Sequence, residues 1–156
     1  MPFDWADRTP ATERLWSRLD VSDLDDIRHC DRADVRDPEA DAVPDEHPTS
    51  LRNRLREWEL MIRRMADGWP PYGYYLLDEY VNDLSIRDGI DTAIGRLREP
   101  LASHVRQLVR ELDTEFAALT EDDAEREIFA HYLPPEDPAD LGPWWHRVPR
   151  TRPWSR

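Results

Sequence analysis

The chain has 156 residues, enough for one domain with its own core, and two complete domains would be cramped. Its formal net charge of −13 disfavours nucleic acid or an anionic membrane as a partner of the whole surface, because both are polyanions. The same charge would attract a basic protein. The high charged fraction is typical of disordered chains, but seven tryptophans and five tyrosines supply the large apolar area that a core needs.

Cysteine usage and the first residues bear on the compartment. Cys30 is the one cysteine, which excludes an intramolecular disulfide and is typical of a reducing compartment. Residues 1–5 have neither the basic nor the apolar region of a signal peptide. No apolar run approaches the roughly 20 residues that cross a bilayer. We therefore expect a cytoplasmic protein without a membrane partner.

Residues 1–48 are predicted to form an acidic N-terminal segment. A short helical pattern runs from Pro10 to about Asp20, and Ser22 is a candidate N-cap for a second short helix. Residues 37–48 contain three prolines and five carboxylates, a composition that predicts a linker or loop.

Residues 49–132 are predicted to form the helical core. The clearest helix starts near Thr49 or Ser50, and Gly68 stands where a C′ glycine would end it. Its apolar residues share one face: Leu51, Leu55, Trp58, Ile62 and Met65. Further helices are predicted in residues 74–84, from Ser85 or Asp88 to Leu97, from Pro100 to Leu119, and from Thr120 to Tyr132. No strand-like alternation is present in the sequence.

Residues 133–156 form a tail rich in proline, tryptophan and arginine, for which we expect an irregular segment packed on the core. The sequence as a whole therefore predicts an all-α fold. Within this class we expect an antiparallel bundle of about four principal helices, with short N-terminal helices and the irregular tail.

The most distinctive candidate site begins after the clearest helix. Tyrosine and tryptophan are enriched at interface hot spots, and exposed carboxylates beside them would attract a basic partner. The predicted contact residues are Trp69, Tyr72, Tyr75, Asp78, Glu79 and Asn82. The alternative interpretation is a solvated helix face beside a packed aromatic loop.

Catalytic and metal-binding motifs are absent from the sequence. Two carboxylate–histidine pairs have the i,i+4 spacing of metal ligands, Asp25/His29 and Glu127/His131, but neither forms HExxH. The surroundings of Cys30 are acidic, which disfavours a reactive thiolate. No glycine-rich phosphate loop and no GxSxG motif occurs. We therefore predict no catalytic residues, no metal site and no cofactor.

Arginine provides the basis for a nucleic-acid alternative. Arg52, Arg56 and Arg63 lie along one line of a predicted helix, with Glu59 on the same line as a local ion-pair partner. The tail combines arginines with three tryptophans, which can stack bases or pack on the core.

The function that this sequence favours is a small acidic protein-binding module that engages a basic partner protein. An inhibitor of the immunity or antitoxin type, or an adaptor, would fit this description. One alternative is a helical-bundle enzyme or metal-binding protein that uses carboxylates and histidines. A weaker one is nucleic-acid binding through the arginine-rich helix and the tail. A homodimer would explain the same aromatic residues as a heteromeric site.

Overall fold

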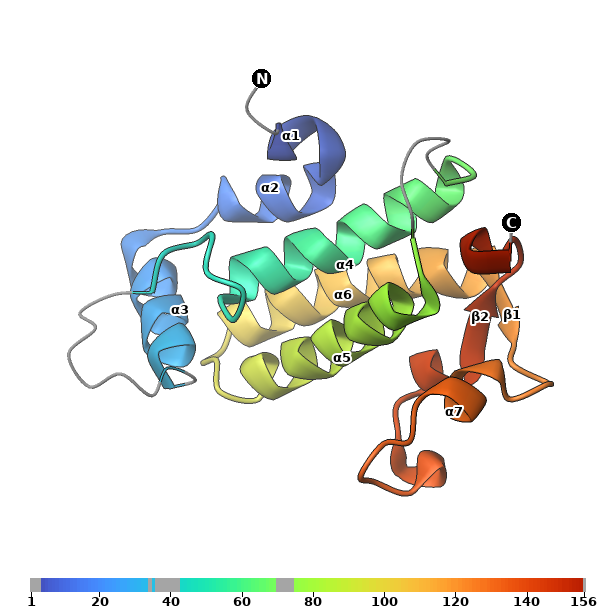
Figure 1. Ribbon diagram of the computed structural model, residues 1–156. Helices are drawn as coiled ribbons and strands as arrows, with labels where there is room; N and C mark the ends of the chain where they lie inside the picture. Colours follow the sequence, from blue (N-terminus) through green and yellow to red (C-terminus); the bar gives the residue numbers. More distant parts are fainter. Residues whose placement is uncertain (1–3, 34, 36–42, 70–74, 156) are drawn as a thin grey trace.

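The structure is a computed structural model and describes residues 4–33, 35, 43–69 and 75–155. The described part is mostly α-helical and contains one two-stranded sheet, so the predicted all-α class is confirmed in outline (Figure 1). No helix in this part of the chain is long and apolar enough to cross a membrane.

Three long helices build the core. They are α4 (Leu51–Ala66), α5 (Leu77–Ile94) and α6 (Leu101–Leu119). Helices α4 and α6 run in one direction and α5 runs in the other, with α4 in contact with both (Figure 1). The five apolar residues predicted for one face of α4 are all buried. Ser50 caps this helix by accepting a hydrogen bond from the Asn53 amide at 3.1 Å, so the predicted helix start is confirmed.

The predicted break near Ser85 and Asp88 is wrong, because α5 continues through it. Ser85 does not act as a cap; its hydroxyl donates to the Val81 carbonyl of the preceding turn, a bond made inside a helix. Leu84 and Ile90 are both fully buried and extend one interior face across the supposed break. The core of the described residues therefore has three long helices, where about four principal helices were expected.

A short sheet follows α6 where the sequence predicted a helix. Strand β1 (Thr120–Asp122) pairs antiparallel with β2 (Arg147–Pro149). Between them lie α7 (Glu127–His131) and the short 3-10 helices η1 (Pro138–Asp140) and η2 (Pro143–His146), and η3 (Pro153–Ser155) follows β2. Three-residue strands are too short to show alternation in a sequence, which explains why they were missed.

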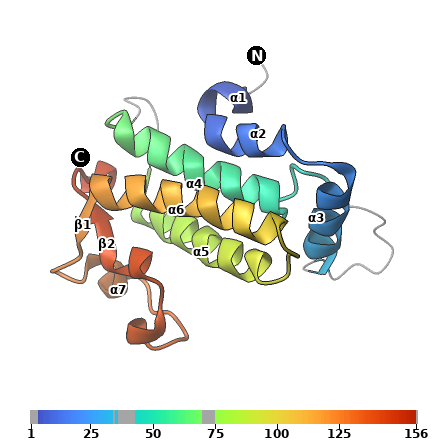
Figure 2. The same ribbon diagram turned by 180° about the vertical axis from the view of Figure 1, so that it is seen from behind.

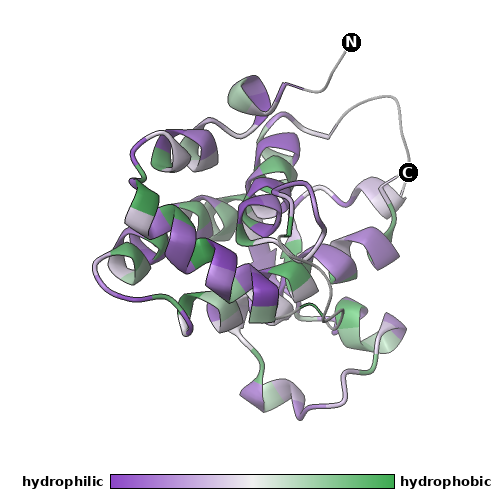
Figure 3. Cartoon of the chain, turned by 90° about the vertical axis from the view of Figure 1, so that its left-hand side faces the viewer, coloured by the Kyte–Doolittle hydropathy of each residue, from purple (hydrophilic) through white to green (hydrophobic). Residues whose placement is uncertain are grey.

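The N-terminal helices cover one side and one end of the bundle. They are α1 (Trp5–Arg8), α2 (Pro10–Trp16) and α3 (Val21–Ala33). Helix α2 lies over α4, and α3 lies at the end of the bundle away from the sheet (Figure 2). Individual helices carry both hydrophobic and hydrophilic residues (Figure 3).

Candidate protein-binding surface

Trp69 is an interior residue. Gly68 and Trp69 both have positive φ, +80° and +65°, and the Trp69 amide donates back to the Arg64 carbonyl at 2.8 Å. This C-terminal turn directs the indole inward, where it is 5 % exposed and donates from Nε1 to the Thr151 carbonyl at 2.9 Å. Trp69 therefore links the end of α4 to the C-terminal segment.

Tyr75 stacks on Trp69, with 4.6 Å between ring centroids, and its hydroxyl donates to the Asp83 carboxylate. Burial, together with the negative charge of Asp83, raises the pKa of Tyr75 well above its ordinary value. Tyr75 is thus partly buried against the core and holds the start of α5 in place. Tyr72, another of the six predicted contact residues, lies outside the described residues.

The other three predicted residues are exposed on one face of α5. The Asp78 carboxylate contacts the imidazole of His131, at the end of α7. Glu79 accepts a hydrogen bond from the Leu76 amide at 2.6 Å, which places its negative charge at the positive end of the helix. The side chain of Asn82 is exposed and makes no hydrogen bond to another side chain or to the backbone of the described residues. The predicted site therefore divides into an aromatic support, Trp69 and Tyr75, and an exposed polar face.

Asp83 lies just inside that face and is not one of the six contact residues predicted from the sequence. It is 8 % exposed, and burial raises its pKa to about 7, with the nearby Glu57 acting in the same direction. The hydrogen bond from Tyr75 and the charge of Arg64 oppose this rise. A carboxyl group with a pKa near neutrality changes its charge in the physiological range, which is a property of many functional acids.

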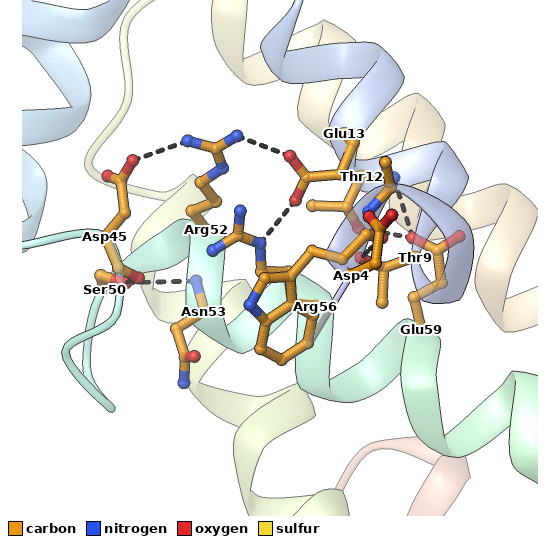
Figure 4. A network of polar contacts seen from close by, with 12 residues as sticks. Asp4, Thr9, Thr12, Glu13, Asp45, Ser50, Arg52, Asn53, Arg56 and Glu59 are labelled. Atoms are coloured by element: carbon orange, nitrogen blue, oxygen red, sulfur yellow. Dashed lines mark hydrogen bonds and ion pairs between the residues drawn. The ribbon is translucent and has the colours of Figure 1, made fainter. Parts of the chain in front are cut away.

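Glu59 is a second interior carboxylate, and it acts as a helix cap. Its side chain is fully buried and accepts from the Ala11 amide at 2.9 Å and from the Thr12 amide at 2.8 Å (Figure 4). The Thr12 hydroxyl donates to it at 2.6 Å. Because Thr9, the N-cap residue of α2, provides no side-chain cap, Glu59 satisfies the free amides of this helix from outside it.

Asp31 provides the same kind of cap for α4. It is 2 % exposed and accepts from the Leu51 amide at 2.8 Å. Interior carboxylates are thus present in this fold, and two of them satisfy backbone amides. Hydrophobic periodicity could not reveal them, since that method assigns every carboxylate to the outside.

The arginine row on α4 is occupied by carboxylates of the same chain. Arg52 and Arg56 both bind Glu13 at 2.5 Å (Figure 4). Arg63 binds Glu59 at 3.1 Å and Glu115 at 2.5 Å. These pairs leave the row little free charge for phosphate, which weakens the nucleic-acid alternative.

The tryptophans of the tail also bind within the chain. The indole N–H groups of Trp144 and Trp145 donate to the two oxygens of Asp88, at 2.8 and 2.9 Å. The guanidinium of Arg87 stacks over the Trp144 ring, 4.1 Å from its centroid. Arg152 pairs with Glu121 and Glu127. The tail therefore uses most of its base-stacking and phosphate-binding groups on its own core.

Neither carboxylate–histidine pair converges on a metal position. His29 bonds to the backbone carbonyl of Asp25, whose side chain instead pairs with Arg28. His131 contacts Asp78, while Glu127 binds Arg152 and Trp154. The described residues contain no group of three histidine, cysteine or acidic side chains that could hold a metal ion.

A pocket of about 840 Å³ lies between α3 and the start of α6. Its lining includes leucines, aspartates and two histidines, His29 and His104. Asp26 accepts from the Arg98 amide at 2.7 Å, and Asp23 accepts from the Asp20 amide at 3.1 Å. These aspartates are therefore engaged in fixing the turns around the pocket.

Asp78, Glu79 and Asn82 are thus the predicted contact residues of the described part whose side chains are exposed to solvent. The chain matches no protein-family model. Comparison with curated proteins and with solved structures likewise gives no match.

Proposed function

We propose that this protein is a small acidic protein-binding module, an inhibitor of the immunity or antitoxin type or an adaptor, which engages a basic surface of a partner through the exposed face of α5. One observation carries the proposal. Asp78 and Glu79 are exposed side by side, and no arginine among the described residues pairs with either of them. The carboxylates at the α2–α4 junction, in contrast, are bound by arginines or amides.

Electrostatics gives this difference its functional meaning. A carboxylate that already binds an arginine has little charge left for a partner. An exposed carboxylate without an arginine contributes more fully to the potential that attracts a basic protein. The net charge of −13 acts in the same direction over longer distances. Within this proposal Trp69 and Tyr75 position the start of α5, and the exposed carboxylates make the contact.

The test is capture of a partner from lysate of the native host at low and moderate salt. The protein is used as wild type, as Asp78→Asn/Glu79→Gln, and as the control Asp7→Asn/Glu111→Gln. The control removes the same charge from two other exposed positions, on α1 and α6. We expect a basic protein that binds the wild type and the control and is lost with Asp78→Asn/Glu79→Gln. Equal recovery by all three forms would contradict the proposal.

An enzyme is the second candidate, and Asp83 is the observation that favours it. A carboxyl group with a pKa of about 7, bonded to a tyrosine hydroxyl, has the proton affinity that general acid–base catalysis requires. Small-molecule extract of the host, incubated with the wild type and with Asp83→Asn, tests this candidate. A metabolite consumed by the wild type alone would support an enzyme, and unchanged metabolite profiles would speak against it.

A further inference from the structure

Two exposed leucines lie beside the carboxylates of α5. Leu76 is 50 % exposed and Leu133 is 85 % exposed. Among the described residues, one further large apolar side chain is exposed to this extent: Val21 of α3, which is 74 % exposed. Helix α3 lies at the end of the bundle away from α7 (Figures 1 and 2). Val21 is therefore separate from the two leucines.

The contact between Asp78 and His131 brings the leucines into one region. Leu76 precedes Asp78 by two residues, and Leu133 follows His131 by two. Two residues of extended chain span about 7 Å at most, so each leucine is attached close to this contact. Helices α5 and α7 also pack against each other. The two leucines thus flank one junction on the surface.

The segment that precedes Leu133 is anchored to the core. Ile128 of α7 is fully buried, and Tyr132 stacks on the buried Trp145 with an interplanar angle of 18°. Asp123 accepts hydrogen bonds from the first amides of α7, at 2.8 and 3.0 Å. Leu133 therefore directly follows an anchored segment, which limits the backbone entropy lost when a partner covers it.

Exposed acidic residues follow each leucine along the chain. Asp78 and Glu79 follow Leu76 on α5, and the exposed Glu136 and Asp137 follow Leu133. An apolar centre with an acidic rim is complementary to a segment whose large apolar side chains are flanked by lysine or arginine.

We propose that Leu76 and Leu133, with the acidic residues that follow each of them, form a docking surface for a basic segment of a partner protein. Apolar side chains of that segment would contact the leucines at the start of α5 and after the end of α7. This inference rests on the proposed function and deepens it: the carboxylates attract the partner, and the leucines provide the area that it buries.

Selection of peptides from a displayed random library on the immobilised protein tests the surface with a defined probe. We expect enriched peptides to be positively charged and to contain at least one large apolar residue. Their affinity should fall about tenfold or more for Leu76→Ser/Leu133→Ser and also for Asp78→Asn/Glu79→Gln. It should be unchanged for Val21→Ser, which removes an equally exposed apolar side chain elsewhere. Circular dichroism should show that all variants keep the wild-type fold.

The outcomes separate the two proposals. Peptides that depend on the carboxylates but bind Leu76→Ser/Leu133→Ser normally would overturn the docking surface and leave the proposed function standing. Peptides indifferent to both variants would overturn both. Enrichment of neutral or acidic peptides, or no enrichment, would overturn the basic occupant. Self-association in sedimentation that is lost in Leu76→Ser/Leu133→Ser would identify a second copy of the chain as the occupant and would also overturn it.

Discussion

The carboxylates of this protein behave differently in two regions, the α2–α4 junction and the α5–α7 surface. At the junction, Glu13 binds two arginines and Glu59 binds two amides and a hydroxyl. On the surface, Asp78 contacts one histidine and Glu79 one amide, and both side chains are exposed. Residues of one chemical type thus hold the fold together in one region and are exposed to solvent in the other.

This difference bears on how a strongly acidic sequence is interpreted. A net charge of −13 describes the whole chain, but it does not say which carboxylates are available. Buried or paired carboxylates should matter for stability and exposed ones for binding. Substitutions in each region test this distinction, and their effects on the free energy of unfolding should range from about 3 kcal/mol for Glu59 to less than about 0.5 kcal/mol for Asp78 and Glu79.

Glu59→Ala should have the largest effect. It leaves the amides of Ala11 and Thr12 without their acceptor and removes one of the two partners of Arg63. We expect a loss of about 3 kcal/mol in the free energy of unfolding, the size typical of breaking a buried charged network. Urea unfolding measures it. Glu111→Ala, at an exposed position of α6, is the control and should change stability by less than about 0.5 kcal/mol. Similar losses for the two variants would remove the distinction between the regions.

Asp83→Asn should change how stability depends on pH. In the folded protein the pKa of Asp83 is raised to about 7, while in the unfolded chain it is near 3.9. Between these values the folded state binds more protons than the unfolded state, so the free energy of unfolding falls as pH rises, and the loss is complete above about pH 7.

An asparagine at this position cannot ionise, so the variant lacks this loss. We expect the stability of Asp83→Asn relative to the wild type to increase by about 2 kcal/mol between pH 5 and pH 8. Urea unfolding at the two pH values measures the difference. A stability difference that is the same at both values would show that Asp83 does not titrate in this range.

Asp88→Ala should loosen the C-terminal segment. It removes the acceptor shared by the indole N–H groups of Trp144 and Trp145. Both hydrogen bonds are only partly buried, so water can replace part of what is lost, and we expect a loss of about 1 kcal/mol in the free energy of unfolding. Trypsin, which cleaves after arginine, should then cut at Arg147 and Arg150 faster than in the wild type. Asp140→Ala removes an exposed carboxylate from the same segment and is the control. Unchanged cleavage would mean that the tail is held mainly by its other contacts.

Asp78→Asn/Glu79→Gln should have the smallest effect on stability. Both side chains are exposed, and the side-chain amide oxygen of the introduced glutamine can still accept a hydrogen bond from the Leu76 amide. We expect a change of less than about 0.5 kcal/mol in the free energy of unfolding, measured by urea unfolding. A loss comparable to that of Glu59→Ala would show that these carboxylates are structural.

The sequence predicted helix α4 well, because a regular apolar face and the signals at Ser50 and Gly68 define it locally. It could not reveal that Glu59 is buried, since the donors on Thr12 and Ala11 come from a helix about 50 residues away. Contacts between distant segments leave no mark in local periodicity.

The candidate site was predictable to a similar degree. Periodicity placed Asp78, Glu79 and Asn82 together on the polar face of a helix, and all three are exposed there. The inward positions of Trp69 and Tyr75 depend on Thr151 and Asp83, two partners that no spacing rule identifies. Leu133 was missed because a single apolar residue beside prolines has no periodic pattern.

A role for the α5 face in binding is tested by the association rate constant of the captured basic partner, measured at about 50 mM and about 300 mM salt. We predict that Asp78→Asn/Glu79→Gln lowers this rate constant several-fold at low salt and that the difference shrinks at high salt. Asp7→Asn/Glu111→Gln, which removes the same charge elsewhere, should lower it much less. Equal rate constants for the two variants, or rate constants that do not depend on salt, would contradict a role for the α5 face in binding.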